Sequence, residues 1–496
     1  MSKTPDTKLF DLIQSLSQTE KRYFKVTTGN SGNNNSHQFM EIFDCVSNME
    51  AYNEEELKKQ LVAGNGSKHL AFRKSHLYDL ILSSLRNYHK SKSAEFEALN
   101  LLQDIKITFD RGLLKQSERL LNKLKKKCFE YNFKQYLVAA TSWEKKITAS
   151  LVSTKFKNSS NYKTEKQLVN QLTQNQNELL SYLKKENELW KLRVQLIDVY
   201  RFDSASLMSS IKSFKAEFAA VLKSQPTTEN HLELKVHKLT MSALINFFEG
   251  DINKGVQNQK KLVELLRNES KYTETNMSGY ASEINNFLTF CFSAETLNDV
   301  PIWLDELDKL FNNPNVRTNL FLRARIYSFH QVNLLRYYNQ KGTYKEFDNK
   351  QYLMFKPHIN SYKNFQIQYN IAISYFFLND FHSALIWINE INNSTTKVRP
   401  VDMSFIRILS YIIHFKFGNH FIIDRAHNSK DKTIRHEVDS NMPEKIMATY
   451  LTKISFNPNQ GKELKEELIN EYDNATPVKN TTHINLLKYL KKNLLK

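Results

Sequence analysis

Few groups of residues in this chain have the types and spacing that catalysis or metal binding would need. Gly64 and Gly66, in GNGSKH, are the glycines nearest to a phosphate-binding loop, but they lack its GxxxxGK[ST] spacing and a preceding strand. His69 and His76 are seven residues apart and so share one face of a predicted helix, yet no third metal ligand is visible beside them. The sequence contains no GxSxG, HExxH, HRD or DFG element.

The acidic residues also lack the arrangement that acid–base chemistry needs. Asp305, Glu306 and Asp308 lie together in LDELDKL, but adjacent acids on a helix usually form a solvated face. The 14 histidines are scattered as single residues. We therefore predict that the protein is not an enzyme and has no catalytic residue, no metal ligand and no cofactor-binding residue.

The composition indicates long helices joined by short connections. With 41% hydrophobic and 12% aromatic residues the chain has enough apolar material for a continuous core, and at 496 residues it is either multidomain or a repeat array. It contains only 11 Gly and 9 Pro, whereas sandwiches, barrels and doubly wound folds need many such turn residues. We therefore predict an all-α fold.

Charge and cysteine usage bear on the partners and the compartment. The net charge of +18 is uneven: residues 101–150 hold 11 Lys/Arg against 5 Asp/Glu, whereas residues 226–330 hold 11 against 13. A basic balance suits an anionic partner such as nucleic acid, or it reflects a Lys-rich solvated surface. The three separated cysteines fit a reducing cytoplasm, and the charged start of the chain is not expected to be a signal peptide. No apolar run is long enough for a membrane span.

The stretch AISYFFLNDFHSALIWINEI, residues 372–391, changes the phase of its apolar pattern half-way. An apolar set with helical spacing ends at Leu378, and a second set begins at Phe381 after Asn379 and Asp380. Asn tolerates the left-handed conformation that ends a helix, and Asp can cap the next one. The phase change therefore predicts a tight turn between two antiparallel helices.

Degenerate versions of this hairpin recur along the chain. Turns between two apolar helical segments are expected near residues 110–112, 249–251, 296, 342 and 418. From 250 onwards, including the turn at 379, successive turns are 37 to 46 residues apart, which is the length of two helices and a linker. Pro301 suits the first turn of the helix after residue 296.

This pattern of small and aromatic positions resembles the tetratricopeptide repeat. The matching positions in the 372–391 stretch are Ala372, Tyr375, Phe381, Ala384 and Ile388. The turn here has Asn379 where the family usually has Gly, and no Pro closes the second helix. The resemblance covers about residues 95–131 and 231–425, and the layout is similar to that of bacterial proteins of this kind. It implies a right-handed α-solenoid of stacked antiparallel hairpins.

The remaining segments divide the chain into four expected parts. Residues 1–92 form an N-terminal helical module, in which Ser17 with Glu20 forms a capping box and Asn53 with Glu56 is arranged similarly. Residues 93–425 form the repeat solenoid, 426–443 a polar loop, and 444–496 three capping helices. Residues 163–200 read as one long helix whose leucines either pack on neighbouring helices or form a coiled-coil seam.

Two functions fit this layout. The first is a protein- or peptide-binding scaffold, in which the first helix of each pair lines a groove; the candidate groove residues are Arg323, Arg325, Tyr327, Gln368 and Tyr369.

The alternative is a nucleic-acid-associated regulator with the solenoid as a sensor. The basic helix at 67–92 would then contact the phosphate backbone through Lys68, Arg73 and Lys74. The same cations would otherwise face water on a bundle that caps the solenoid. The sequence does not name the partner or the oligomeric state.

Overall fold

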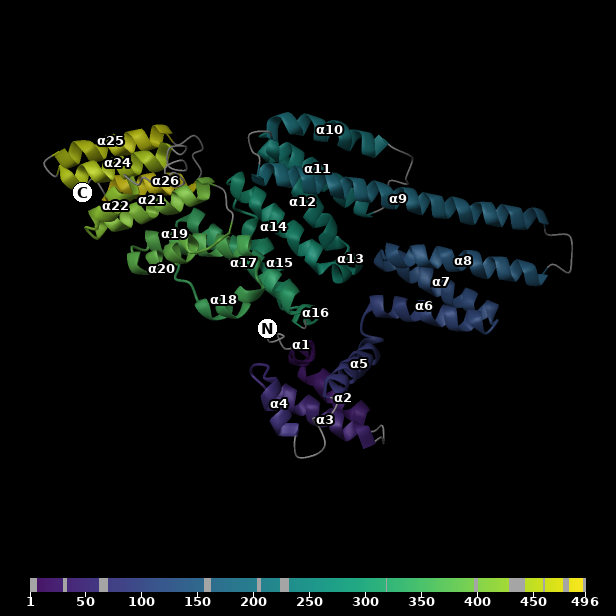
Figure 1. Cartoon of the computed structure of the whole chain (residues 1–496). Coiled ribbons are helices and arrows are strands. Elements are labelled where there is room, and N and C mark those ends of the chain that lie inside the picture. The colour runs from purple at the N-terminus through teal and green to yellow at the C-terminus, as the bar shows by residue number, and fades with distance from the viewer. Residues whose placement is uncertain are drawn as a thin grey trace. The chain divides into compact units, whose positions relative to one another are not determined.

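Every regular element in the described part of the computed structural model is a helix (Figure 1), which confirms the all-α prediction. The structure describes residues 7–29, 34–61, 70–155, 162–202, 207–223, 232–317, 319–396, 400–427, 442–457, 460–475 and 481–493. The helices group into two compact units, Met1–Leu179 and Leu180–Lys496. The domain boundaries expected after residues 92, 425 and 443 stay predictions.

The first unit is built from short N-terminal helices followed by longer ones. Its helices are α1 (Lys8–Ser15), α2 (Gln18–Gly29), α3 (Asn34–Ser47), α4 (Glu54–Leu61), α5 (Leu70–His89), α6 (Ala94–Asp110), α7 (Leu114–Tyr131), α8 (Lys134–Lys155) and the beginning of α9 (Tyr162–Phe202). Buried side chains from α1 to α5 form one hydrophobic cluster, and those from α6 to α8 form another. The N-terminal helices therefore have a core of their own.

The capping box predicted at Ser17 is present at the start of α2. The Ser17 N–H donates to Glu20 Oε2 over 2.8 Å, and the Glu20 N–H donates to Ser17 Oγ over 3.3 Å. His89, the last residue of α5, places its Nε2 2.7 Å from Glu20 Oε1. Burial alone would raise the pKa of Glu20, but the hydrogen bonds from Ser17 and His89 bring it below its ordinary value.

We expect Glu20→Gln to make this bundle less sensitive to acid. The folded-state pKa of Glu20 lies below its unfolded value, so its stabilisation is present above the ordinary carboxyl pKa and is lost as the pH falls through the folded value. The wild type should therefore lose more stability than the variant between neutral and acidic pH. Thermal melts at a series of pH values measure this, with Glu55→Gln as the exposed control. Equal acid sensitivity in wild type and Glu20→Gln would contradict it.

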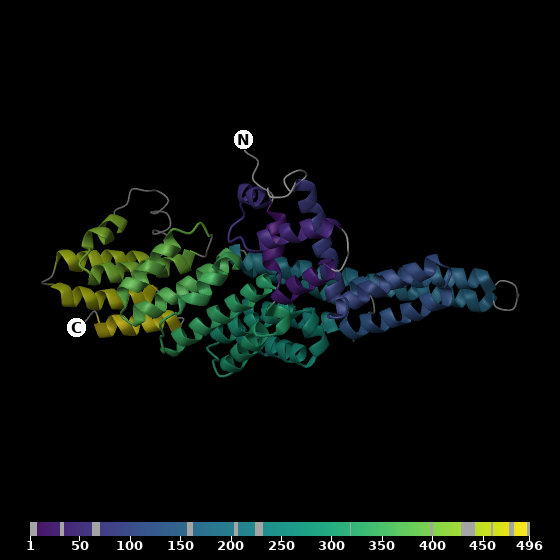
Figure 2. The same ribbon diagram turned by 90° about the horizontal axis from the view of Figure 1, so that it is seen from below.

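The second unit continues with helices joined mostly by short turns. They are the rest of α9, α10 (Leu207–Lys223), α11 (Leu232–Phe248), α12 (Ile252–Asn268), α13 (Ser270–Thr275), α14 (Met277–Ser293), α15 (Val300–Phe311), α16 (Pro314–Arg317), α17 (Leu320–Lys341), α18 (Asn349–Phe355), the 3-10 helix η1 (Lys356–His358), α19 (Ser361–Phe377), α20 (Phe381–Asn392), α21 (Pro400–Lys416), α22 (His420–His427), α24 (Met442–Phe456), α25 (Gly461–Ala475) and α26 (Thr481–Asn493). The three expected C-terminal helices, α24 to α26, lie together in Figure 1 and in Figure 2.

Helices that are neighbours in the chain pack against each other through most of this unit. The pairs α11–α12, α14–α15, α19–α20 and α24–α25 are each in contact, and α17 packs on both α14 and α19. One hydrophobic cluster extends from α11 to α17 and a second from α17 to α26, so α17 belongs to both. Phe311 packs against both clusters, which places α15 at the same junction.

Each turn predicted from the sequence contains or adjoins a residue in the left-handed backbone conformation. Residues with φ between 56° and 90° occur at or beside every predicted turn: Gly112, Gly250, Glu295, Gly342, Asn379 and Gly418. At the hairpin quoted above, Asn379 has φ 62° and Asp380 Oδ1 accepts from the Ser383 N–H at 3.1 Å. Ala372 and Ala384 have no exposed surface, so the two helices approach closely there. The predicted hairpin is confirmed.

Two further predictions concern α9 and the polar segment. Helix α9 runs from Tyr162 to Phe202 without a break, as predicted for 163–200. Within the second unit, Tyr182 and Leu189 cluster with Leu234 of α11, so this part of α9 packs on its neighbours. The expected polar loop at 426–443 falls mainly on residues 428–441, which lie outside the described residues; α22 ends at His427 and α24 begins at Met442.

Candidate functional site

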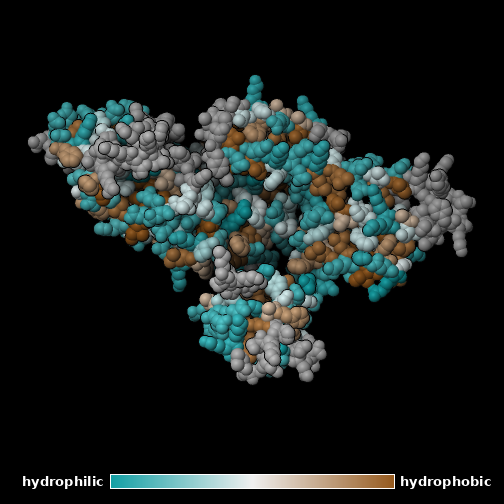
Figure 3. Space-filling view, in the orientation of Figure 1, coloured by the Kyte–Doolittle hydropathy of each residue, from teal (hydrophilic) through white to brown (hydrophobic). Residues whose placement is uncertain are grey.

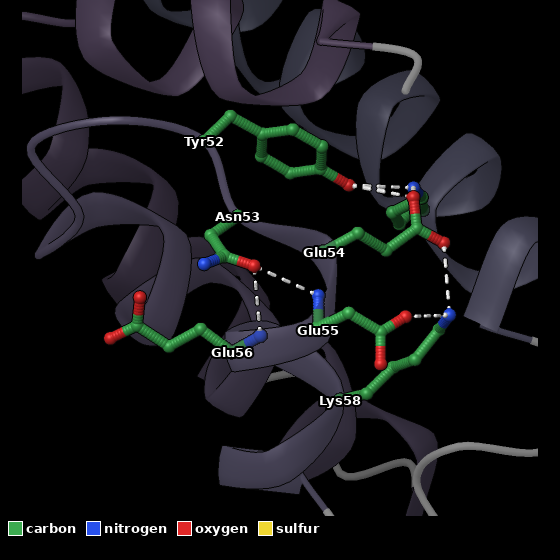
Figure 4. Close-up of polar contacts among 7 residues, drawn as sticks. Tyr52, Asn53, Glu54, Glu55, Glu56 and Lys58 are labelled. Carbon is green, nitrogen blue, oxygen red and sulfur yellow. Dashed lines mark hydrogen bonds and ion pairs between the residues drawn. The ribbon is translucent and has the colours of Figure 1, made fainter. Parts of the chain in front are cut away.

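The first unit contains an open cleft between α3, α4 and α5. Its volume is about 1390 Å³, and five carboxylates line it: Asp44, Glu50, Glu54, Glu55 and Glu56. The Asn53 side chain starts α4 by accepting from the N–H groups of Glu55 (3.1 Å) and Glu56 (3.2 Å), as Figure 4 shows. Three of the acids therefore lie in the first turn of α4, where the helix dipole stabilises negative charge.

Among the described residues that line this cleft, Lys74 is the one cation, and it is held by an acid and a phenol. Its Nζ donates to Tyr52 Oη over 2.8 Å and lies 3.2 Å from Glu54 Oε2, and its side chain is only 13% exposed. The hydrogen bond from Lys74 holds the pKa of the Glu54 carboxyl below its ordinary value. Lys58, just outside the lining, lies 3.0 Å from Glu55 (Figure 4). The described part of the lining is therefore negative overall.

Two of the three residues predicted to bind nucleic acid lie in the described part of α5. Lys68 lies outside the described residues. Arg73 is half-buried on α5, and Lys74 is engaged with Glu54 and Tyr52. The part of α5 that the structure describes thus presents Lys74 to an acidic cleft.

The predicted groove residues Arg323 and Tyr327 lie together on α17. Both contact the same two rings, Phe311 of α15 and Phe355 of α18. Tyr327 is only 3% exposed, so it contributes to the core rather than to a surface. Arg323 is partly exposed. Tyr327 therefore lies on the buried side of the Phe311 and Phe355 rings, and Arg323 lies on their partly exposed side.

The other three predicted groove residues are spread over different contacts. Arg325 is exposed, and its Nη2 donates to Ser282 Oγ of α14 over 3.0 Å. Gln368 is 3% exposed and donates to Glu390 of α20 over 2.9 Å. Tyr369 is half-buried, and its ring lies 5.8 Å from Phe365 and 6.2 Å from Phe405. The structure brings Arg323 and Tyr327 together, and it places the other three elsewhere on α17 and α19.

A ladder of buried amides between successive helices was not predicted from the sequence. Asn333 of α17 donates to Asn285 of α14 over 3.1 Å. Asn339 of α17 donates to the Asn370 carbonyl of α19 over 3.0 Å and accepts from Ser374 over 2.7 Å. The available signal was weak: Asn333 and Asn339 lie next to the apolar and aromatic residues of VNLLRYYN, residues 332–339. Such buried amides favour one register between the helices because a shift would leave them unpaired.

Three further groups that could do chemistry, Asp305, Glu306 and Cys128, have structural contacts or are buried. Asp305 lies 2.7 Å from Lys309, and Glu306 accepts from Tyr280 over 3.2 Å. Burial raises the pKa of the Cys128 thiol to about 11, so it stays protonated and unreactive at neutral pH. Within the described part of the chain, no three His, Cys, Asp or Glu side chains converge as a metal site would require.

Apolar side chains also reach the surface in both units. In Figure 3, hydrophobic residues (brown) lie among hydrophilic ones (teal) over the visible face. The most exposed large ones in the described residues are Phe72 (72%), Phe321 (73%) and Phe421 (73%). Among the helices that the structure describes, none combines the length and apolarity needed to cross a bilayer.

Comparison of the chain with protein-family models, curated proteins and solved structures finds no match.

Proposed function

We propose that this protein is a non-enzymatic binding scaffold for protein or peptide segments. In this proposal the hairpins stack into a right-handed, tetratricopeptide-like α-solenoid, and the first helices of the pairs form the binding face. The observation that carries it is the recurrence of a left-handed turn residue between packed helices, from Gly112 to Gly418. Helix pairs of this kind bury their apolar faces by stacking, which leaves extended surfaces for ligands.

The amide ladder supports this proposal because it fixes the spacing of the helices that would form the binding face. The bond from Asn333 to Asn285 favours one register between α17 and α14, and the bond from Asn339 to Asn370 favours one register between α17 and α19. A binding surface made from several helices needs such fixed spacing, because affinity is lost when side chains must be ordered on binding. The exposed aromatic and arginine side chains on these helices are of the types enriched at protein interfaces.

The alternative, a nucleic-acid-associated regulator in the cytoplasm, has less support from the geometry. Binding to phosphates needs several unpaired cations on one surface. Lys74 is instead bonded to Glu54 and Tyr52, beside four further carboxylates. The alternative predicts salt-sensitive DNA binding that is lost on reversing Lys68, Arg73 and Lys74 together.

A capture experiment with a competition arm tests the scaffold proposal. The immobilised full-length chain is incubated with native lysate, and bound proteins are identified with and without an excess of the free chain. We expect a defined set of proteins or peptides whose capture the free chain abolishes. A mobility-shift assay with duplex DNA at several salt concentrations runs in parallel. Salt-sensitive DNA binding without any competable protein would favour the alternative and contradict the scaffold.

A further inference from the structure

Arg323 is a cation that two aromatic rings hold in place and that has no polar partner among the described residues. Its Cζ lies 4.8 Å from the ring centre of Phe311 and 5.4 Å from that of Phe355. Its Nε is buried and has no hydrogen-bond partner, and among the described residues none bonds to its other nitrogens or forms an ion pair with it. Other arginines of the second unit do pair with carboxylates: Arg193, Arg267 and Arg407.

This arrangement stabilises the position of the guanidinium; Nε is enclosed, and the two terminal nitrogens are the donors that a ligand can reach. Cation–π contacts with two rings orient the planar group, so little rotamer freedom remains to be lost when a ligand binds. A guanidinium carries five N–H donors in a fork that matches a carboxylate in bidentate geometry. The two terminal nitrogens can donate to both oxygens of a carboxylate, and such charge-assisted pairs are stronger than neutral hydrogen bonds.

Apolar side chains lie on the same helices. Phe321, two residues before Arg323, is 73% exposed, and its ring lies 5.6 Å from that of His358 in η1. Met354, which precedes Phe355 on α18, is 52% exposed. Arg323 and Phe321 both contact the short segment formed by α18 and η1, Arg323 at Phe355 and Phe321 at His358. We call Phe321, Arg323, His358 and the neighbouring Met354 the Arg323 patch. Arginine, aromatic residues and methionine are the types over-represented at protein interfaces.

We propose that the Arg323 patch binds an acidic side chain of a protein or peptide segment, with an apolar residue of that segment next to the acid. The carboxylate would take the free donors of Arg323, and the apolar residue would contact Phe321 and Met354. This inference rests on the scaffold function proposed above, and it names the ligand class and the residues that recognise it.

A carboxylate suits this patch better than a nucleic-acid backbone does. Tracking a phosphate backbone takes several cations in a row. The neighbouring cation on this segment, Lys356, is already 2.8 Å from Glu390. One available guanidinium beside exposed apolar side chains matches a single acid flanked by an apolar residue.

A peptide array tests the inference. The full-length protein is applied to short blocked peptides in which one Asp or Glu is placed beside Leu, Ile, Met or Phe, together with the same peptides carrying Asn or Gln. We expect retention of acidic–apolar peptides and not of their amide counterparts. In solution, the best peptide should bind Arg323→Gln at least about 10-fold more weakly than wild type, because a charge-assisted bidentate pair is lost.

Two variants and a second probe separate the outcomes. Arg325→Gln removes a neighbouring exposed charge on α17 and should leave the affinity unchanged, whereas Arg323→Lys, which keeps the charge without the fork, should give an intermediate affinity. Peptides that bind Arg323→Gln as well as wild type would overturn the inference and leave the scaffold standing. If no peptide binds the wild type, the inference falls, and the lysate capture described above decides separately whether the scaffold proposal stands. Arg323-dependent binding of a single-stranded oligonucleotide in place of peptides would overturn the inference in favour of nucleic acid.

Discussion

Replacing Glu444 with alanine is expected to lower the free energy of unfolding of the second unit by about 3 kcal/mol. Glu444 lies in the first turn of α24 and has no exposed surface. Arg407 of α21 donates to both of its oxygens, Nε over 2.6 Å and Nη2 over 2.9 Å, and the Tyr411 hydroxyl donates over 3.2 Å. The substitution would remove the acceptor and leave a largely buried cation without its counter-charge.

Urea unfolding followed by circular dichroism measures this effect. Glu444→Gln keeps one acceptor oxygen and should cost less than alanine, because the buried charge is lost but one hydrogen bond stays. Glu463→Ala, an exposed acid on α25, is the matched control and should change stability by less than about 0.5 kcal/mol. A Glu444→Ala midpoint equal to that of Glu463→Ala would show that the pair does not hold α24 on α21.

Truncating Phe376 to alanine should cost about 3 to 5 kcal/mol. Phe376 is on α19 and is fully buried. Its ring lies 5.8 Å from that of Phe381 on α20 and 4.9 Å from that of Tyr489 on α26. The ring therefore joins a hairpin to a helix more than 100 residues later, and its loss would leave a cavity that three helices share.

The same unfolding experiment separates this packing effect from surface effects. Phe456→Ala, at an aromatic residue that is 67% exposed on α24, is the matched control and should be nearly neutral. Phe376→Leu should recover part of the stability, because it fills part of the cavity. A Phe376→Ala variant as stable as Phe456→Ala would be inconsistent with α26 packing on α19.

The turns were predictable because their chemistry is local. A backbone with positive φ favours Gly or Asn, and an Asp or Asn side chain caps the helix that follows, so Asn379 with Asp380 and Gly250 with Asp251 could be read directly. The turn near residue 296 shows the limit of this reasoning. There the left-handed residue is Glu295, with φ 56°, and its residue type gives no such signal.

The surfaces were harder to predict because burial depends on contacts between distant segments. Tyr327 and Gln368 were predicted to line a groove, yet each is only 3% exposed, since α17 and α19 are surrounded by helices on most sides. Lys74 was predicted as a phosphate contact from the basic run around it. The acids of α4, some 20 residues earlier, are what surround it in the structure.

The sequence by itself determined that the chain is helical, where its hairpins turn and which residues cap them, because these depend on a few neighbouring residues and on a helical period. Only the tertiary structure decided which face of each helix is covered, that α17 joins two cores, and that Arg323 lies between two rings from α15 and α18. Those features depend on how one helix rotates against the next, and apolar residues on most sides of a helix leave that rotation undetermined in sequence alone.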